Sequence, residues 1–338
     1  MTVGELSPSD ALRQMVNGYQ VSRAVHVAAM LGIADLLADG PRGVEELATR
    51  TGSHAPTLYR VLRLLASVGV FAEDVEGRFG LTPRAECLQA DVPGSLRAWT
   101  IMFGGPSFWA SWGALPDSVR TGETAFPLVH GMDRWEYLAR HPEESAAFDA
   151  AMTELSAGES AAVLDSYDFS GIGVLADVGG GKGGLLAAIL AANPSMRGIL
   201  LDQPHVVAGA AELLSQAGVA DRCQIVGGSF FESVPGGADA YLLKSIIHDW
   251  PDEQAIAILR TCRAAMADGG KLLLLERIIR PGNEPDLAKL IDLIMLVMNG
   301  GRSRTADELD RLLATAGFRL GSTVRTASPL SVLEATPA

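Results

Sequence analysis

Cysteine is scarce in this 338-residue chain, and the three cysteines that occur are far apart. Cys87, Cys223 and Cys262 form no CxxC pair and no spacing that metal ligands use. A disulfide scaffold and a cysteine-based metal site are therefore excluded, and the pattern fits a reduced cytoplasmic protein.

Basic residues are also in short supply, with 27 Lys and Arg against 40 Asp and Glu and a formal net charge of −13. Phosphates and anionic lipid headgroups are not attracted to such a surface, so we expect neither nucleic acid nor membrane as a partner. No apolar run approaches the roughly 18 residues of a spanning helix. The opening "MTVGELSPSD" lacks the basic and apolar regions of a secretory signal. These absences predict a soluble, acidic, cytoplasmic protein.

Apolar residues make up 48% of the chain, and its length allows two domains. Residues 11–38 are apolar at helical spacing and predict a long helix and a short one. Two further helices are predicted at 44–51 and from residue 53 or 54, followed by a hairpin of 70–73 with 78–81.

Helix, turn, helix and hairpin form the winged-helix pattern, which often binds DNA. Residues 41–90 contain six basic and six acidic side chains, so no basic stripe is available for phosphates. We therefore expect residues 1–98 to form a winged-helix dimerisation domain.

Residues 99–170 are predicted to be helical and are rich in tryptophan, phenylalanine and methionine. Such a stripe is compatible with ordinary core packing. Because few tryptophans occur elsewhere, the alternative is that these helices line a ligand pocket.

Strands and helices alternate from about residue 172. Strands are predicted at 174–180, 197–204, 223–230, 239–247 and 271–279, helices at 183–193, 206–218, 253–267 and 305–317, and β segments near 318–326 and 329–335. Thr305 and Glu308 are spaced as a helix capping box. Continuous apolar strands between helices predict a doubly wound parallel sheet with both faces covered.

A glycine-rich loop, "DVGGGKGG", follows the first of these strands. Gly179 and Gly181 permit a tight turn and close approach of a ligand. A phosphate-binding Walker loop is excluded because the GxxxxGK[ST] pattern is absent. Asp202 could hold ribose hydroxyls of either a dinucleotide or S-adenosylmethionine (SAM). Asp177, just before the glycines, favours SAM, since a carboxylate suits a cationic amino-acid group and not a pyrophosphate.

Six segments together resemble the SAM-dependent O-methyltransferases of the plant caffeate and bacterial natural-product type. In order they are "DVGGGKGG", "LLDQP", "GGSFFESVP", "LLKSIIHDWPDE", "LLLLERII" and "NGGRSRT". The strand ending in Leu-Lys-x-x-x-His-Asp-Trp is specific to that family, and the resemblance covers nearly the whole chain. It implies an α/β fold in which residues 99–338 form the methyltransferase domain. Within it, residues 99–170 line the pocket and 171–338 form a Rossmann-like, seven-stranded core, while the N-terminal domain makes a homodimer.

The resemblance also implies where SAM binds, and that no metal is needed. The residues expected at the cofactor are Asp177, Gly179, Gly181, Asp202, Ser229, Phe230 and Lys244. Ser229 and Phe230 would lie against the adenine, and Lys244 would reach the ribose or the carboxylate. Ser229 departs from the family, which commonly has aspartate at this position.

For catalysis, the resemblance implies that His248 is the general base, because histidine can take a phenolic proton near neutral pH. Glu276 would orient its imidazole, and Asp249 would contact the cofactor or the substrate hydroxyl. Asp249 could equally be a helix N-terminal charge favoured by the helix dipole. Ser303 stands where the family usually has a second glutamate, which leaves His248 with one of the two usual carboxylate partners.

The substrate wall is expected to come from flexible and aromatic side chains. They are Met102, Trp109, Phe148, Met152 and Met295, and Asn299 could hydrogen-bond a substrate oxygen. The activity implied is methyl transfer from SAM to a hydroxyl of an aromatic small molecule, with S-adenosylhomocysteine as the other product. A SAM-dependent hydroxylase or decarboxylase, an NAD-dependent oxidoreductase and a winged-helix regulator are the alternatives.

Overall fold

The computed structural model describes residues 7–338, which divide into two compact units. The first comprises the chain up to Trp109 together with Leu138–Leu155. The second comprises Ala110–Tyr137 and Ser156–Ala338. Each unit is described by itself below.

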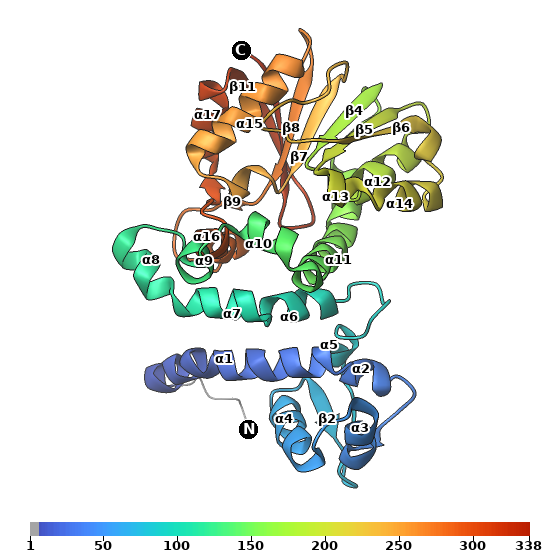
Figure 1. Ribbon diagram of the computed structural model, residues 1–338, viewed down its shortest axis with the longest axis vertical. Helices are drawn as coiled ribbons and strands as arrows, with labels where there is room; N and C mark the ends of the chain where they lie inside the picture. Colours follow the sequence, from blue (N-terminus) through green and yellow to red (C-terminus); the bar gives the residue numbers. More distant parts are fainter. Residues whose placement is uncertain (1–6) are drawn as a thin grey trace. The chain divides into compact units, whose positions relative to one another are not determined.

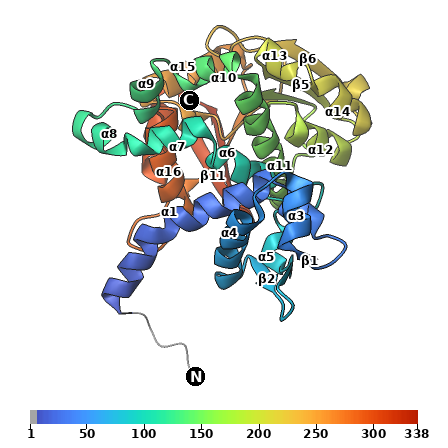
Figure 2. The ribbon, with the colours of Figure 1, turned by 60° about the horizontal axis from the view of Figure 1, so that its bottom comes forward.

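The first unit has the predicted order of helices followed by a hairpin (Figure 2). Its elements up to residue 86 are α1 (Pro8–Met30), α2 (Ile33–Leu36), β1 (Arg42–Gly43), α3 (Val44–Thr51), α4 (Ala55–Ser67), β2 (Phe71–Glu73), β3 (Arg78–Leu81) and α5 (Pro83–Glu86). The two-residue strand β1, too short for a sequence pattern, adds a third strand to the predicted hairpin in the order β1-β3-β2. One buried apolar cluster joins α1, α2, α3, α4, β2 and β3.

A run of helices follows, as the sequence predicted. They are α6 (Arg97–Phe103), α7 (Pro106–Gly113), α8 (Leu115–Thr121), α9 (Ala125–His130), α10 (Arg134–Arg140) and α11 (Pro142–Ser166). Some aromatic residues of these helices pack on one another. The ring centroids are 4.0 Å apart for Trp99 and Phe103 and 4.3 Å apart for Phe103 and Phe108.

The second unit contains the predicted seven-stranded sheet, in the order β11-β12-β8-β7-β4-β5-β6. Its strands are β4 (Val174–Val178), β5 (Arg197–Asp202), β6 (Cys223–Gly227), β7 (Ala240–Lys244), β8 (Lys271–Glu276), β11 (Phe318–Arg325) and β12 (Ser331–Pro337). Strands β4 to β8 pair in parallel. The predicted parallel sheet is confirmed for these five strands, and the last part of the chain adds β12, which is antiparallel to both its neighbours.

Helices cover both faces of this sheet (Figure 1). One face packs against α15 (Asp252–Ala265) and α17 (Ala306–Thr315). The other packs against α12 (Gly184–Ala192), α14 (Ala210–Gln216) and the end of α11. The strand order reverses at β4, between β5 and β7, and open α/β sheets bind ligands at the carboxyl ends of the strands at such a point.

Several sequence-predicted boundaries are corrected. The helix predicted at 206–218 is two helices, α13 (Pro204–Val207) and α14, and α16 (Leu287–Met298) had not been predicted. The strand predicted to reach residue 247 ends at Lys244. The segment 271–279 is broken at Arg277 into β8 and β9 (Ile278–Ile279), and β9 pairs with β10 (Arg304–Thr305). The capping box of α17 is confirmed.

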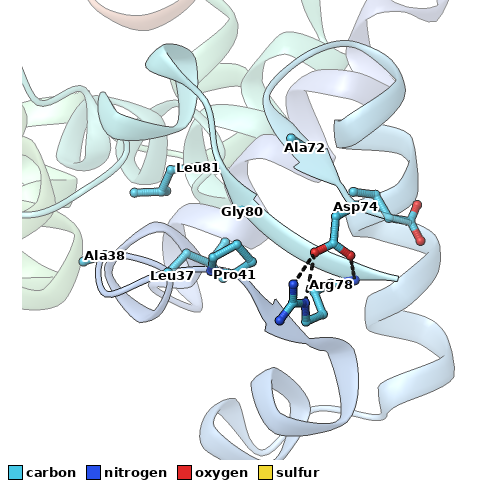
Figure 3. Close-up of a pocket in the computed structure, with 10 residues that line it drawn as sticks. Leu37, Ala38, Pro41, Ala72, Asp74, Arg78, Gly80 and Leu81 are labelled. Carbon is cyan, nitrogen blue, oxygen red and sulfur yellow. Dashed lines mark hydrogen bonds and ion pairs between the residues drawn. The ribbon is translucent and has the colours of Figure 1, made fainter. Parts of the chain in front are cut away.

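The first unit also has an open hollow of about 400 Å³ beside the hairpin (Figure 3). Backbone and aliphatic groups line most of it, and its charged side chains include Asp74 and Arg78, which pair with each other. No helix within residues 7–338 is long and apolar enough to cross a membrane. The same residues contain no cluster of three metal-ligating side chains.

Candidate active site

The histidine of the His-Asp-Trp motif lies on a short 3-10 turn, η2 (Ile247–Asp249), just beyond the carboxyl end of β7. The chain reaches the turn through Ser245, whose φ of 54° lies in the left-handed region. Non-glycine residues rarely adopt this conformation, and it marks a sharp change in chain direction. His248 is buried there, with 8% of its surface exposed.

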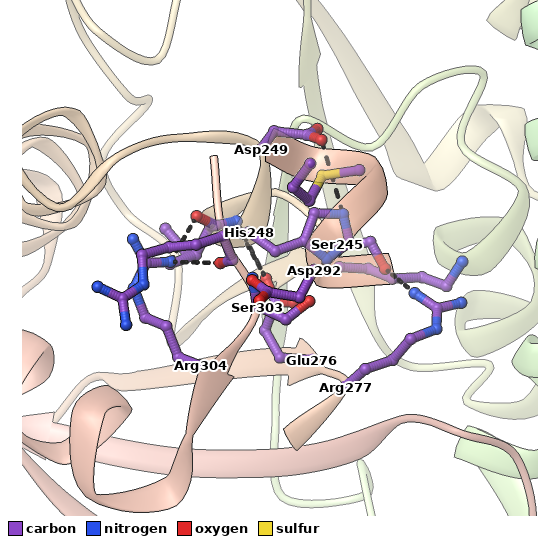
Figure 4. Close-up of polar contacts among 12 residues, drawn as sticks. Ser245, His248, Asp249, Glu276, Arg277, Asp292, Ser303 and Arg304 are labelled. Carbon is purple, nitrogen blue, oxygen red and sulfur yellow. Dashed lines mark hydrogen bonds and ion pairs between the residues drawn. The ribbon is translucent and has the colours of Figure 1, made fainter. Parts of the chain in front are cut away.

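Glu276 supports this turn from the end of the neighbouring strand β8, and it is 2% exposed. Its Oε1 accepts the backbone N–H groups of Ile247 at 3.0 Å and of His248 at 3.3 Å. Its Oε2 lies 3.1 Å from Nδ1 of His248, an ion-pair distance without the alignment of a hydrogen bond (Figure 4). The carboxylate therefore holds the backbone of the turn and faces the ring.

The electrostatics of the site make His248 more basic. Burial lowers the pKa of the imidazole, but the carboxylates of Glu276 and Asp249 raise it by more, and the net pKa lies above 6.5. Arg277 opposes this rise in the pKa.

Asp249 is connected to two other elements through hydrogen bonds. Its Oδ1 lies 3.6 Å from Nε2 of His248 and accepts a bond of 2.5 Å from Nδ2 of Asn299, the residue that follows α16. Oδ1 of Asn299 in turn accepts a bond of 3.0 Å from Nη1 of Arg134. Burial raises the pKa of Asp249, and His248 and Arg134 oppose that rise.

Arg304 binds the backbone carbonyl oxygens of the same segment, whereas Glu276 binds its N–H groups (Figure 4). The side chain is 2% exposed, and its guanidinium donates to the carbonyl oxygens of Ile247 and Trp250, both at 2.9 Å. It also pairs with Asp252 at 2.7 Å. Arg304 thus fixes the backbone on both sides of His248.

The glycines before Arg304 have a steric role. A Cβ on Gly301 would lie 2.1 Å from the carbonyl oxygen of His248, so only glycine lets the loop lie this close to the turn. Gly300 has a φ of 74°, and a Cβ there would lie 2.7 Å from Oγ1 of Thr124.

Ser303, where the family usually has a glutamate, is also buried, with 2% of its surface exposed. Its backbone N–H donates to Oδ1 of Asp292 on α16 at 2.9 Å, and its hydroxyl has no hydrogen-bond partner among the described residues. Burial raises the pKa of Asp292.

The glycine loop follows β4 and has the backbone the sequence predicted. Gly179 and Gly181 have φ values of 74° and 61°. A Cβ on Gly179 would lie 2.6 Å from the side chain of Ile246, whereas a Cβ on Gly181 would meet nothing within 4 Å. Oδ2 of Asp202 accepts the N–H of Gly181 at 2.8 Å.

Asp177 is 2% exposed, and one of its carboxylate oxygens has no partner among the described residues. Burial raises its pKa to about 7, while Lys244 opposes that rise. A buried carboxylate with a free acceptor beside a glycine loop can receive a cationic ligand group.

Lys244 ends β7, and its ammonium points to α11. It lies 2.7 Å from Oε2 of Glu159 and 2.9 Å from Oγ of Ser156. Glu159 also pairs with Arg277. The ammonium therefore has two protein partners before any ribose or carboxylate contact is considered.

The other expected residues are distributed over both units. Oγ of Ser229 accepts the N–H of Phe231 at 3.3 Å, and the ring of Phe230 is half-buried beside Gly179 and Ile246. Of the expected substrate wall, Met295 and Asn299 belong to the second unit. The remaining four, Met102, Trp109, Phe148 and Met152, belong to the first.

Three residues that contact the site were missed by sequence reasoning. Arg304 was detectable as the second arginine of "NGGRSRT", and Glu159 had no signal beyond its position in a helix. Arg134 had none, because its importance depends on a contact with Asn299, 165 residues later.

Two known domain families match most of this chain. The O-methyltransferase domain family matches residues 112–319, and the O-methyltransferase dimerisation domain matches residues 13–91. Phenazine O-methyltransferase PhzM of Lysobacter antibioticus is 48% identical over 334 residues, or 99% of this chain and 98% of that protein.

Solved structures similar over nearly the full chain include the two that follow. The crystal structure of LaPhzM has a TM-score of 0.95 and 47% identity, covering 98% of this chain and all of that one. NcsB1, an O-methyltransferase from neocarzinostatin biosynthesis solved with SAM and 2-hydroxy-5-methyl naphthoic acid, has a TM-score of 0.81 and 37% identity. It covers 94% of this chain and 96% of that one.

The chain belongs to the O-methyltransferase family. It is a methyltransferase that uses SAM as methyl donor. The predicted family, fold class and cofactor are thereby confirmed.

Proposed function

We propose that this enzyme transfers the methyl group of SAM to a phenolic hydroxyl of a polycyclic or substituted aromatic natural product, with His248 as general base. The observation that carries the proposal is the buried imidazole at the carboxyl end of β7, held between Glu276 and Asp249.

His248 would remove the proton that a phenol keeps near neutral pH. The pKa of a phenol is about 10, so a positioned base is needed for a nucleophilic oxygen to form. Nε2 would accept the proton, because Nδ1 faces Glu276. The carboxylates of Glu276 and Asp249 then stabilise the imidazolium on its two sides.

The residues at the glycine loop fit SAM. The partnerless oxygen of Asp177 suits the ammonium of its amino-acid portion, and the Gly179 cradle, which a Cβ would fill, suits close approach. Asp202 would hold the ribose, and Phe230 with Ser229 would lie against the adenine. When bound, SAM supplies a methyl group on a sulfonium that is already a good leaving group.

Aromatic acceptors are favoured by the side chains expected at the substrate wall. Phe148 and Trp109 offer flat faces, and Met102, Met152 and Met295 adapt to them. Acceptors of this kind are also the ones that the similar enzymes bind or are named for, a phenazine and a hydroxynaphthoic acid.

The test is a mass-detected panel of a hydroxyphenazine, 1,4-dihydroxy-2-naphthoate and 3-amino-4-hydroxybenzoate with SAM. We expect a gain of one methylene unit on one of them. His248→Ala should lower kcat by about 10²–10⁴-fold and retain SAM binding. The control is His54→Ala, at an exposed histidine of the first unit, which should leave kcat unchanged. In the wild type, the rate should rise as pH passes through the raised pKa of His248, because only the neutral imidazole accepts a proton.

The proposal would be contradicted if folded wild-type protein did not bind SAM. It would also be contradicted if His248→Ala kept full activity on the phenol. A product heavier by one oxygen atom would instead indicate the hydroxylase alternative, which the serine at position 303 keeps open.

We also propose that residues 1–98 form a dimerisation domain and residues 99–338 the methyltransferase domain of a homodimer. The match of residues 13–91 to a dimerisation family supports this. A second support is an exposed apolar stripe on α1, formed by Leu12, Met15, Val16 and Tyr19, which are 55–77% exposed.

A further inference from the structure

Helix α10 approaches the turn that carries His248 with two consecutive side chains. Arg134 donates to Asn299, which donates to Asp249. The ring of Trp135 stacks on that of Trp250, with centroids 6.3 Å apart and planes inclined by 27°. Two neighbouring residues of α10 are thus connected to two neighbouring residues of the His-Asp-Trp motif, Arg134 to Asp249 through Asn299 and Trp135 to Trp250 directly.

Asn299 uses both ends of its side-chain amide in this arrangement. Its NH₂ group faces the carboxylate of Asp249, and its carbonyl oxygen faces the guanidinium of Arg134. An amide bound at both ends cannot rotate without losing a bond, so its orientation is fixed. The carboxylate of Asp249 is fixed with it, 3.6 Å from Nε2 of His248.

The charges agree with this geometry. Arg134 is only 7% exposed, and a buried cation needs a compensating anion. Asp249 is a nearby carboxylate on which Arg134 acts electrostatically. The charged groups that face His248 are Glu276 from β8, Asp249 from its own turn and Arg277 after β8, and Arg134 acts on the second of these.

We propose that Arg134 is a positioning residue which, through Asn299, holds the carboxylate of Asp249 beside Nε2 of His248. The proposal rests on the proposed function of His248 as the base. It assigns to Arg134 no contact with the reacting atoms.

Two consequences follow from this role. Without Arg134, Asn299 can rotate and Asp249 is no longer held next to the atom that receives the proton. A cation is also removed from the His248–Asp249 pair, so the pair should keep its last proton to a higher pH. Catalysis should therefore begin at a higher pH and reach a lower maximum.

The experiment uses the full-length enzyme and the acceptor that the panel identifies. Arg134→Gln and Asn299→Ala should each lower kcat by about 10–100-fold, the scale of a misplaced catalytic geometry, with the dissociation constant of SAM unchanged. The double variant should lose little more than either single variant, because both changes break one chain of contacts. Arg134→Lys, which keeps the charge, should recover most of the pH profile, and Arg140→Gln, at an exposed arginine of the same helix, should resemble the wild type.

Independent, additive losses in the double variant would overturn the proposal, as would an unchanged pH profile and kcat in Arg134→Gln. If Arg134→Gln does not fold, Asn299→Ala and Arg134→Lys carry the same test. Titration of the His248 imidazole by NMR in wild type and Arg134→Gln needs no turnover. An unshifted titration would therefore refute this proposal even if the panel gave no product and the proposed function failed.

Discussion

Asp177 is a carboxyl group at the glycine loop to which water has almost no access, and burial raises its pKa to about 7. In an unfolded chain the same carboxyl would titrate near 3.8. Since the pKa of the folded protein is the higher one, this group favours folding most at low pH, and its contribution is lost as pH rises through about 7.

We predict that SAM binding at pH 6.5 releases a proton from Asp177, because a ligand cation beside the carboxyl lowers its pKa. Calorimetric titrations in two buffers of different ionisation enthalpy should give different heats for the wild type. Asp177→Asn should remove that difference and weaken SAM binding by about tenfold or more, as expected for a hydrogen bond to a charged group. Equal heats in both buffers for the wild type would contradict the prediction.

Sequence reasoning reached some of these residues and missed others for a physical reason. Asp177 and Glu276 lie at the carboxyl ends of buried strands, and His248 lies just beyond another. Parallel strands bring their carboxyl ends to one edge, so the convergence of these residues could be expected. Arg134 acts through contacts made only after folding, and an arginine in a helix carries no sign of its burial. Arg304 belongs to the recognised segment "NGGRSRT", but the carbonyl oxygens that it binds could not be read from that pattern. The pairing of Lys244 with Glu159 was hidden for the same reason.

The 3-10 turn is the element that carries His248, and both Glu276 and Arg304 support it from outside the turn. The guanidinium donates to the carbonyl oxygens of Ile247 and Trp250. Removing it leaves the oxygen of Trp250 without that donor, whereas the oxygen of Ile247 keeps the N–H of Trp250 at 3.4 Å. Each buried polar group left unsatisfied costs about 1–3 kcal/mol.

We predict that Arg304→Met lowers the free energy of unfolding by about 1–3 kcal/mol and also lowers kcat, because the turn loses its shape. Arg302→Met is the matched control. Arg302 is half-exposed and pairs with Glu308 on the surface, so its loss should cost about 1 kcal/mol or less. Urea unfolding with the kinetic assay measures both effects, and equal destabilisation by the two variants would disprove the special role of Arg304.

Strand β7 and the segment 271–279 differed from the prediction at positions without glycine or proline, whereas the helix predicted at 206–218 breaks at Ala208 and Gly209. Strand β7 ends at Lys244 because Ser245 takes a left-handed conformation, and a serine in the sequence does not predict that conformation. Helix α16 is buried at half of its positions and lacks the polar face that marks most helices. The capping box of α17 was recognised because it is a local pattern.

At the scale of the whole molecule, the sheet combines distant parts of the chain, with β12 between β8 and β11. Alternation of strands and helices predicted the parallel part, since parallel strands need a crossover connection, which is usually a helix. It could not predict the place of β12, since the last two strands have no helix between them.

We predict that Met15→Asp weakens self-association, because it places a charge in the middle of the exposed apolar stripe of α1. In Figure 2 this half of α1 extends beyond α3 and α4 of its own unit. Sedimentation velocity should show a dimer for the wild type and a shift toward monomer for the variant. Asn17→Asp, an equal charge on the exposed helix surface, should leave the dimer intact, and a monomeric wild type would refute the prediction.

The contact of Gly301 with the backbone of His248 also limits how this enzyme can evolve. The loop lies so close to the turn that carries His248 that a larger residue at Gly301 would collide with its backbone. Variation in chemistry must therefore come through side-chain exchanges at neighbouring sites such as Ser303 and Asp292. A mutant library directed at these two positions would sample new reactivity while the scaffold of the loop is inherited unchanged.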